Sequence, residues 1–286
     1  MEEKNERGET LKEFLARYDE TQYRRPSNTV DMILLTVLKG KLKVLLVKRK
    51  DHPFIHDWAM PGGFVNFDED LDAAMKRELE EETNLFDSTY FRQLYTFGNA
   101  DRDPRTRVIT TVYLSMTPAE NIKMTSAGDD AMDTGWFTIQ KITMTTDGHE
   151  RKSILMLDEE EKGIHLRYEI YDTACDNYVQ TRSKLLESSN AKLAADHIKA
   201  INMAIDVVRN RAASTGIMFN LLPKECTLRE IQEVYEAIVN HPVDTGNFRR
   251  DIKKMLVATG NTTIVNGRKV ATYSFNPLLP FVKETL

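Results

Sequence analysis

The sequence predicts an α/β protein with a second, smaller domain at its C-terminal end. A chain of 286 residues is long enough for two domains, since about 150 residues per domain is typical. Within residues 29–139, strand-like apolar runs surround one long acidic segment with helical composition. Residues 217–286 show a different pattern, in which two helical segments are followed by two short strand-like runs.

Composition excludes several classes of protein. Hydrophobic residues make up 41% and charged residues 29%, which is typical of a folded globular chain. We expect no membrane partner, because no run approaches the roughly 20 apolar residues that span a bilayer. The N-terminus lacks the pattern of a secretory signal, and the two cysteines, Cys175 and Cys226, lie far apart. We therefore expect a protein of the reducing cytoplasm.

The first strands are predicted from apolar runs and a glycine. Leu11, Phe14, Leu15 and Tyr18 have the spacing of a short amphipathic helix in an otherwise polar lead. The runs Thr29–Leu38 and Lys43–Arg49 then form a predicted β-hairpin whose turn contains Gly40. Three further strands are predicted at Phe91–Gly98, Val108–Met116 and Thr134–Ile139.

Residues 140–211 give weaker signals. Ser153–Leu157 and Ile164–Tyr171 are predicted to pair as a hairpin. Asp176–Asn190 is polar and is interpreted as a linker. A helical pattern returns over Leu193–Arg211.

The acidic segment carries the chemistry. Glu69–Thr83 lacks Pro and Gly and consists mostly of helix-forming residues, with Asp68 as the expected N-cap. On a helix, Glu78 lies on the same face as Glu81 and Glu82, so their carboxylates repel each other unless a cation lies between them. Oxygen ligands favour Mg²⁺ or Mn²⁺, and a carbonyl of the Gly62-Gly63 loop is a further candidate ligand. The alternative is a solvated acidic helix face.

The spacing over residues 63–85 resembles the Nudix box, Gly-x5-Glu-x7-Arg-Glu-U-x-Glu-Glu-x-Gly-U, where U is apolar. The one departure is Asn84 in place of glycine, and asparagine is the next-best residue for a left-handed helix end. The matching residues are Gly63, Glu69, Arg77, Glu78, Leu79, Glu81, Glu82 and Leu85.

The resemblance implies an α/β/α sandwich around a mixed sheet and hydrolysis of a nucleoside diphosphate linked to another group. It implies that Glu78, Glu81 and Glu82 hold Mg²⁺ or Mn²⁺, that Arg77 orients them, and that Glu69 is a supporting carboxylate. The general base varies in this family between a box glutamate and an acid on a later loop. Asp129 and Asp130 lie on such a loop and are candidates, the alternative being a turn with a helix cap.

A charged loop bears on the substrate. Residues 98–107 read GNADRDPRTR, and arginine offers paired donors to phosphate, so Arg102, Arg105 and Arg107 are predicted to contact a ligand. The alternative is a charged surface turn. The run resembles Nudix proteins that act on ADP-ribose, which implies ADP-ribose or a similar nucleoside diphosphate as substrate.

The C-terminal residues hide a basic patch in an acidic chain. The net charge is −5, yet residues 240–275 hold six Lys or Arg and two Asp or Glu. Thr227 and Asp244 are expected to cap helices over Leu228–Val239 and Thr245–Leu256, and Thr262–Phe275 is expected to form two strands around Asn266-Gly267. This is the order of a winged helix-turn-helix, with a solvated helix face as the alternative. The predicted DNA contacts are Arg249, Arg250, Lys253, Lys254, Arg268 and Lys269.

This part of the chain also resembles the winged helix that follows the Nudix domain in transcriptional regulators of NAD metabolism, for which ADP-ribose is the effector. Two functions are therefore predicted: a Mg²⁺-dependent ADP-ribose pyrophosphatase, or an ADP-ribose-responsive regulator with little or no hydrolase activity. Double-stranded DNA is an expected partner, and a homodimer suits both functions. The predicted divisions are a helical lead (1–27), a Nudix domain (28–145), an insertion or linker (146–190) and a winged-helix domain (191–286).

Overall fold

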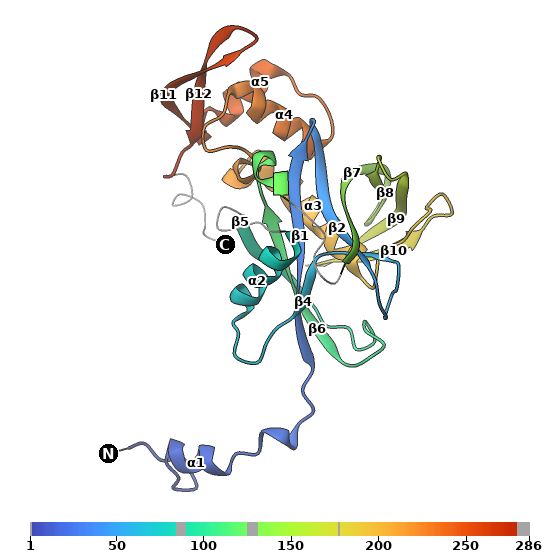
Figure 1. Cartoon of the computed structure of the whole chain (residues 1–286), viewed down its shortest axis with the longest axis vertical. Helices are drawn as coiled ribbons and strands as arrows, with labels where there is room; N and C mark the ends of the chain where they lie inside the picture. Colours follow the sequence, from blue (N-terminus) through green and yellow to red (C-terminus); the bar gives the residue numbers. More distant parts are fainter. Residues whose placement is uncertain (1, 84–89, 125–130, 177, 279–286) are drawn as a thin grey trace.

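The computed structural model describes residues 2–83, 90–124, 131–176 and 178–278. One ten-stranded sheet forms the body, helices cover both of its faces, and a small helical domain with a two-stranded hairpin follows (Figure 1). The part of the chain up to residue 212 thus has the predicted α/β/α arrangement, and residues 228–275 have the predicted order of a winged helix. No described helix is long and apolar enough to cross a membrane.

The sheet is mixed. Its main path runs β10-β9-β8-β7-β2-β1-β6-β5, with short strands β3 and β4 paired to β2 and β1. β1 and β6 are parallel, in register from Ser27 opposite Val108 to Leu35 opposite Met116, whereas the other described pairs are antiparallel. The strands are β1 (Ser27–Leu38), β2 (Lys41–Arg49), β3 (Trp58–Ala59), β4 (Gly62–Phe64), β5 (Tyr90–Phe97), β6 (Val108–Met116), β7 (Ala131–Asp147), β8 (Glu150–Glu159), β9 (Ile164–Cys175) and β10 (Tyr178–Leu185).

The hairpin of β1 and β2 has the predicted turn. Lys39 and Gly40 both have positive φ, 52° and 71°, which is the backbone of a tight turn that suits the twist of an antiparallel pair. Gly40 adopts this conformation without steric cost. The hairpin brings Leu38 opposite Lys41 and so sets the register of both strands.

Strand β1 is buried on both faces, which explains its nearly continuous apolar sequence. Met32 and Leu34 pack on one face with Met75 and Leu79 of helix α2 (Leu71–Thr83). Ile33 packs on the other face, in a core shared with helix α3 (His197–Ala212) and with helix α4 (Leu228–Val239) of the C-terminal domain. The sheet is therefore the common support of the acidic helix and of the C-terminal domain.

Residues 150–185 extend the sheet. β8 and β9 form the predicted hairpin but are longer than predicted, and they pair from Glu150 opposite Thr173 to Glu159 opposite Ile164. The prediction of a linker over Asp176–Asn190 is wrong, because β10 pairs with β9 there. Its polar sequence suits an edge strand with little burial on either face.

The C-terminal domain follows the predicted order. Thr227 caps α4 (Leu228–Val239) in a capping box with Glu230, and Asp244 accepts a hydrogen bond from the Asn247 amide at the start of α5 (Thr245–Ile252). The second helix is shorter than predicted, since its last turn tightens into a 3₁₀-helix over Lys253–Met255. The hairpin consists of β11 (Leu256–Val265) and β12 (Arg268–Phe275) around Asn266-Gly267.

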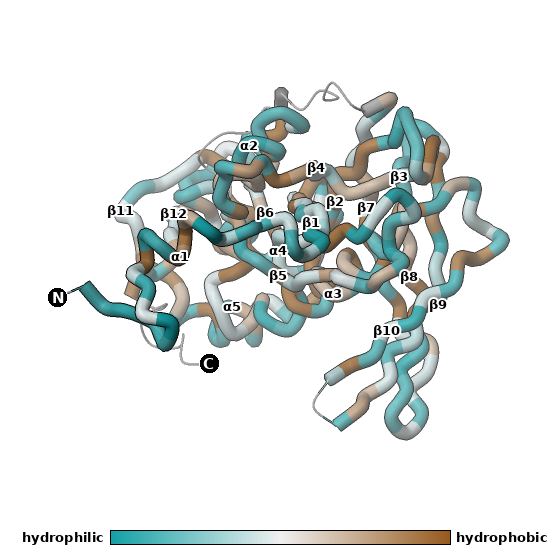
Figure 2. The backbone as a smooth tube through the Cα atoms, turned by 90° about the horizontal axis from the view of Figure 1, so that it is seen from below, coloured by the Kyte–Doolittle hydropathy of each residue, from teal (hydrophilic) through white to brown (hydrophobic). Residues whose placement is uncertain are grey.

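The N-terminal segment stands away from the sheet (Figure 1). Helix α1 (Leu11–Arg17) forms where an amphipathic helix is predicted, and Thr10 and Glu13 close a capping box at its start. None of its residues is buried, and the side chains of Leu11 and Leu15 are exposed. Figure 2 shows that this segment is mostly hydrophilic, so these leucines are isolated apolar groups on a polar arm.

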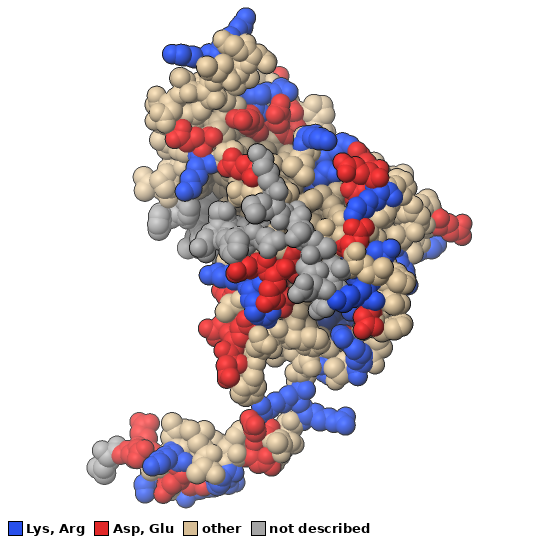
Figure 3. All heavy atoms as spheres, in the orientation of Figure 1, with Lys and Arg blue, Asp and Glu red and all other residues tan. Residues whose placement is uncertain are grey.

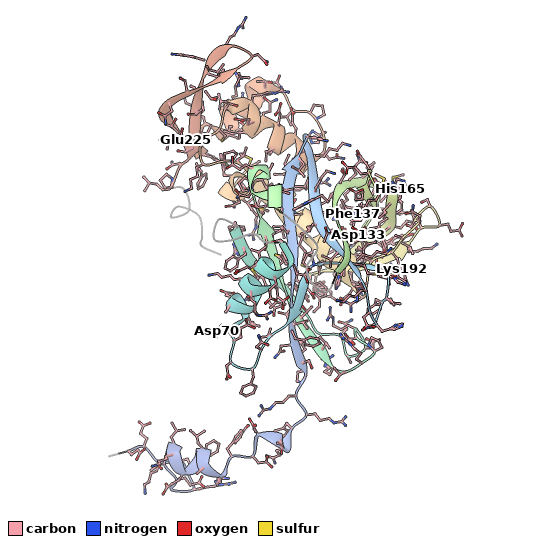
Figure 4. All side chains as sticks on the ribbon, in the orientation of Figure 1. Asp70, Asp133, Phe137, His165, Lys192 and Glu225 are labelled. Atoms are coloured by element: carbon pink, nitrogen blue, oxygen red, sulfur yellow. The ribbon has the colours of Figure 1, made fainter. Side chains whose placement is uncertain are left out.

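Phe137 of β7 is an anchor of the larger core. Its ring is fully buried and meets Trp58 edge to face, with ring centroids 4.8 Å apart; Figure 4 labels it within the body of the sheet. Phe137→Ala should lower the free energy of unfolding by about 3–5 kcal/mol, because a cavity replaces the ring. Urea unfolding followed by circular dichroism measures this loss. Tyr178→Ala, at a 66% exposed side chain, is the control and should cost less than about 0.5 kcal/mol.

Candidate active site and winged helix

Helix α2 begins at Leu71, two residues after the predicted start. The Asp70 carbonyl accepts the first helical hydrogen bond, from the Ala74 amide, so the prediction of Asp68 as N-cap is wrong. Glu69 remains in the loop because its carboxylate accepts a hydrogen bond from the Asn66 amide at 3.1 Å. Asp70 is labelled in Figure 4 at the end of this loop.

Arg77 is the centre of an ion cluster. Its guanidinium donates twice to Glu69, at 2.8 and 3.0 Å, and once to the Phe64 carbonyl at 3.0 Å. Its Nη1 atom donates to Glu78 at 2.7 Å and to Glu81 at 3.1 Å. Hydrogen bonds from Arg77 lower the pKa of Glu69, and those to Glu69 and Glu78 raise the pKa of Arg77. One guanidinium therefore joins Glu69 of the loop to two glutamates of the helix.

Gly63 admits the carboxylate of Glu78. A Cβ atom at position 63 would lie 2.2 Å from Glu78 Oε1, closer than any real contact, so a side chain here would displace the glutamate. Glu78 is only 8% exposed, and burial raises the pKa of its carboxyl while Arg77 lowers it. The glycine and the arginine together keep a buried carboxylate beside the helix.

The donor set suits a hard divalent cation. Glu78 and Glu81 direct oxygen atoms at one position, which the Nη1 atom of Arg77 occupies, and Glu82 lines the same cavity. Carboxylate oxygens are the ligands that Mg²⁺ and Mn²⁺ prefer. Among the described residues, no three His, Cys, Asp or Glu side chains already surround one point as a cage. Arg77 is thus the cation that brings Glu78 and Glu81 together here.

A cavity of about 880 Å³ lies beside α2. Its acidic wall contains Glu78, Glu81 and Glu82, together with Gly62 and Gly63. Basic side chains line other parts of it: Lys48, Arg49, Arg102 and Arg105. Figure 3 shows acidic and basic atoms side by side over α2. Such a cavity suits a ligand that carries phosphate groups and meets a cation at one end.

Two of the three predicted ligand-contacting arginines line the cavity, and the third does not. Arg102 lines the cavity, is 7% exposed, and is held by Asp196 at 2.9 Å and Asp31 at 3.9 Å. Arg105 also lines it, pairs with Asp103 at 2.8 Å, and stacks over the Phe64 ring with its Cζ atom 5.6 Å from the centroid. Arg107 is exposed and is not among the residues that line the cavity.

Several residues in or beside the cavity were not predicted from the sequence. Asp31 accepts a hydrogen bond from Thr110 at 2.6 Å, but its position inside an apolar strand gave no signal of a site. His197 is buried, and its Nδ1 atom accepts a hydrogen bond from the Met60 amide at 2.9 Å, while burial lowers its pKa. His197 lines the cavity, and Asp196 holds Arg102; both come from the start of α3, far along the chain, so only the fold brings them to this site.

Two predictions lie outside the described residues. The candidate bases Asp129 and Asp130 belong to the segment 125–130, and Asn84 belongs to 84–89. Of the predicted catalytic set, the structure therefore describes Glu69, Arg77, Glu78, Glu81 and Glu82.

The basic side chains of the C-terminal domain are exposed. Arg249 and Arg250 project from α5, whose Phe248 is buried and meets Tyr235 of α4 with ring centroids 5.1 Å apart. In Figure 3, basic atoms also mark the tip of the hairpin of β11 and β12. The remaining predicted contacts are exposed as well: Lys253, Lys254, Arg268 and Lys269.

The mixed sheet, the box helix and the cavity define a Nudix-type domain, and the following helices and hairpin define a winged helix. The NUDIX domain family matches residues 26–157, and the NrtR DNA-binding winged helix domain family matches residues 218–275. An ADP-ribose pyrophosphatase of Methanocaldococcus jannaschii is 34% identical over 143 residues, which are 49% of this chain and 80% of that protein. The chain belongs to the Nudix family and carries an NrtR-type winged helix.

Relatives that span both domains are similar as well. The ADPR responsive transcriptional repressor NtrR of Acinetobacter baylyi is 28% identical over 266 residues, or 92% of this chain and 87% of that protein. The crystal structure of a MutT/nudix family protein from Enterococcus faecalis is similar with a TM-score of 0.69, 29% identity and 95% coverage of both chains. Shewanella oneidensis NrtR complexed with a 27mer DNA gives a TM-score of 0.59 at 25% identity, covering 88% of this chain and 94% of that chain.

Removing the guanidinium of Arg77 should make the free energy of unfolding depend on pH through Glu78. In Arg77→Met without added metal, the pKa of buried Glu78 should rise further above its unfolded value, because burial is no longer opposed by the guanidinium. Stability then falls as pH rises through that folded pKa and is regained below the unfolded value of about 4.3. Urea unfolding at pH 4.5 and 7.5 should show a larger destabilisation at pH 7.5. In Arg77→Met/Glu78→Gln this pH dependence should disappear, and its persistence would contradict the assignment to Glu78.

Proposed function

We propose that this protein binds ADP-ribose, or a similar nucleoside diphosphate derivative, in the cavity beside α2 and hydrolyses its pyrophosphate. One observation carries the proposal: Glu78, Glu81 and Glu82 gather at one wall of a cavity whose lining also includes the basic residues Lys48, Arg49, Lys50, Arg102 and Arg105. The M. jannaschii relative, named as an ADP-ribose pyrophosphatase, supports the choice of substrate.

Each part of the site has a role in this hydrolysis. Glu78, Glu81 and Glu82 would hold Mg²⁺ or Mn²⁺, which supplies positive charge against the charge that develops when water attacks phosphorus. Glu69 holds Arg77 in place through two hydrogen bonds, and Arg77 orients Glu78 and Glu81. Arg102 and Arg105 are placed to bind phosphate oxygens or the ribose at the basic wall.

The enzymatic proposal predicts defined products. Purified protein with Mg²⁺ and ADP-ribose should release AMP and ribose 5-phosphate, and chelation of the metal should stop the release. Glu82→Gln should lower kcat at least about 100-fold, because a ligand that helps to stabilise the transition state is lost. Glu80→Gln, at an exposed position of the same helix outside the cavity, should keep the wild-type rate. Chromatography of the products measures the release of AMP. If no AMP is released from any nucleotide sugar or dinucleotide tested, the proposal is refuted.

A second candidate function is regulation of transcription in response to ADP-ribose, with little or no hydrolysis. The exposed basic residues of α5 and of the hairpin favour it, since this helix would enter the major groove while the hairpin contacts phosphates. The A. baylyi repressor and the DNA complex of S. oneidensis NrtR support it. Two winged helices are needed for paired half-sites, so this function includes a homodimer.

DNA binding should weaken steeply with salt. Upstream DNA of the protein's own operon should be retarded in a gel at low salt, and Arg249→Ala/Arg250→Ala should reduce the slope of log affinity against log salt by about 2. Arg182→Ala/Lys184→Ala removes the same charge from the edge strand β10, far from α5 in Figure 1, and should leave the slope unchanged. No retardation of any upstream fragment by the wild-type protein would count against this function.

A further inference from the structure

Residues 192–197 complete the wall of the cavity although they lie beyond the matched Nudix segment. The Trp58 amide donates to the Lys192 carbonyl at 3.0 Å, and the Ala194 amide donates to the Trp58 carbonyl at 2.8 Å. Ala194, Ala195 and His197 then line the cavity directly. Figure 4 labels Lys192, where this segment enters the body. Helix α3 follows at once and runs for 16 residues, a length of about 24 Å.

The cavity end of α3 is held by an arginine that faces the ligand space. Asp196, the residue before the helix, accepts two hydrogen bonds from Arg102, at 2.9 and 3.3 Å. Arg102 is nearly buried and also faces Asp31 at 3.9 Å. A phosphate group in the cavity would be another anion for the same guanidinium, in competition with Asp196. Occupancy of the cavity therefore acts directly on the anchor of α3.

The middle of α3 meets the sheet through polar groups. Asn202, Asp206 and Arg209 share one face of the helix by their spacing. Asp206 pairs with Lys141 of β7 at 2.7 Å and with Arg151 of β8 at 2.8 Å, and Arg151 also pairs with Asp172 of β9 at 2.7 Å.

The ion pairs of this polar contact share their partners. The side chain of Lys141 is 3% exposed, so the buried ammonium depends on the carboxylates of Asp206 and Asp172. Arg151 already divides its hydrogen bonds between two carboxylates, Asp172 and Asp206. A small shift of α3 would redistribute these bonds, whereas the apolar side chains of the same helix, such as Ile201 and Ile205, lie in the core shared with β1.

The far end of α3 is fastened to the winged helix. Arg209 Nε donates to the Ile238 carbonyl, in the last turn of α4, at 2.9 Å. Its Nη1 atom donates to the Lys141 carbonyl at 3.2 Å, so one guanidinium joins α3, α4 and β7. Burial lowers the pKa of Arg209, which indicates a charge in a largely dry position between these elements. Neither Ile238 nor Lys141, the two residues whose carbonyls accept from Arg209, lines the cavity or belongs to the predicted DNA surface.

We propose that α3 couples the ligand cavity to the winged helix, with Arg102–Asp196 as the contact that senses the ligand and Arg209–Ile238 as the contact that positions the DNA-binding domain. The inference rests on the proposed binding of ADP-ribose and of DNA, and it adds the element that connects them. Coupling of this kind is reciprocal: if ADP-ribose changes the affinity for DNA by some factor, DNA changes the affinity for ADP-ribose by the same factor.

The test measures that factor in both directions. With EDTA present, so that ligand is not consumed, titration calorimetry gives the Kd of ADP-ribose with and without operator DNA, and fluorescence anisotropy gives the Kd of DNA with and without ADP-ribose. Wild-type protein should give the same factor in both measurements, at least about fivefold. Arg209→Met, which removes both hydrogen bonds, should bring the factor to within about twofold of unity while the Kd of ADP-ribose alone stays unchanged. Arg211→Met, at an exposed arginine of the same helix, is the matched control and should couple as wild type does.

The outcomes separate the two proposals. Wild-type coupling in Arg209→Met would overturn the role of α3 while leaving the proposed function intact. Failure of the wild-type protein to bind ADP-ribose or DNA would overturn the proposed function and the coupling with it. If thermal melting shows that Arg209→Met is unfolded, Arg209→Lys is measured instead. Lysine keeps the charge, but it lacks the planar group that reaches the carbonyls of both Ile238 and Lys141. Its factor should lie between those of the wild type and unity, and an unchanged factor would overturn the proposal.

Discussion

The hydrogen bonds of Arg77 are the interaction on which the acidic site depends. Three carboxylates from a loop and a helix would repel one another, and Glu78 in addition loses its hydration against Gly63. A single guanidinium offsets both costs, because its fork reaches Glu69 on one side and Glu78 and Glu81 on the other. The bond from Arg77 to the Phe64 carbonyl ties this cluster to β4 and so to the sheet. The position of the site is thus determined by the register of β4 on β1.

Local signals explain the parts of the fold that the sequence predicts. The turn at Gly40, the capping box of Thr227 with Glu230, and the cap at Asp244 each depend on residues within a few positions of one another. The same holds for the box helix, where Arg77, Glu78 and Glu81 are neighbours on one helix. A group of functional side chains that lie within one short segment can be predicted from that segment alone. The acidic wall of the cavity is such a group, because its glutamates all lie on α2.

Non-local contacts explain what the sequence does not predict. Strand β10 has a polar sequence, and only its pairing with β9 makes it a strand. The bond between Arg102 and Asp196 joins residues that are 94 positions apart, so neither indicates the other in the sequence. The start of α2 differs from prediction for a related reason: Glu69 bonds Asn66 and Arg77 instead of entering the helix. In each case a tertiary partner outweighs the local preference.

The backbone pairing of Trp58 with residues 192–194 has a consequence for the evolution and the dissection of the chain. A fragment cut at the end of the matched Nudix segment, residue 157, would lack one side of its own binding chamber and leave β3 without this neighbour. Strands β8 to β10 precede residues 192–194, and after these strands the chain returns to Trp58. The two halves of the protein therefore share a wall and are not independent modules joined by a tether.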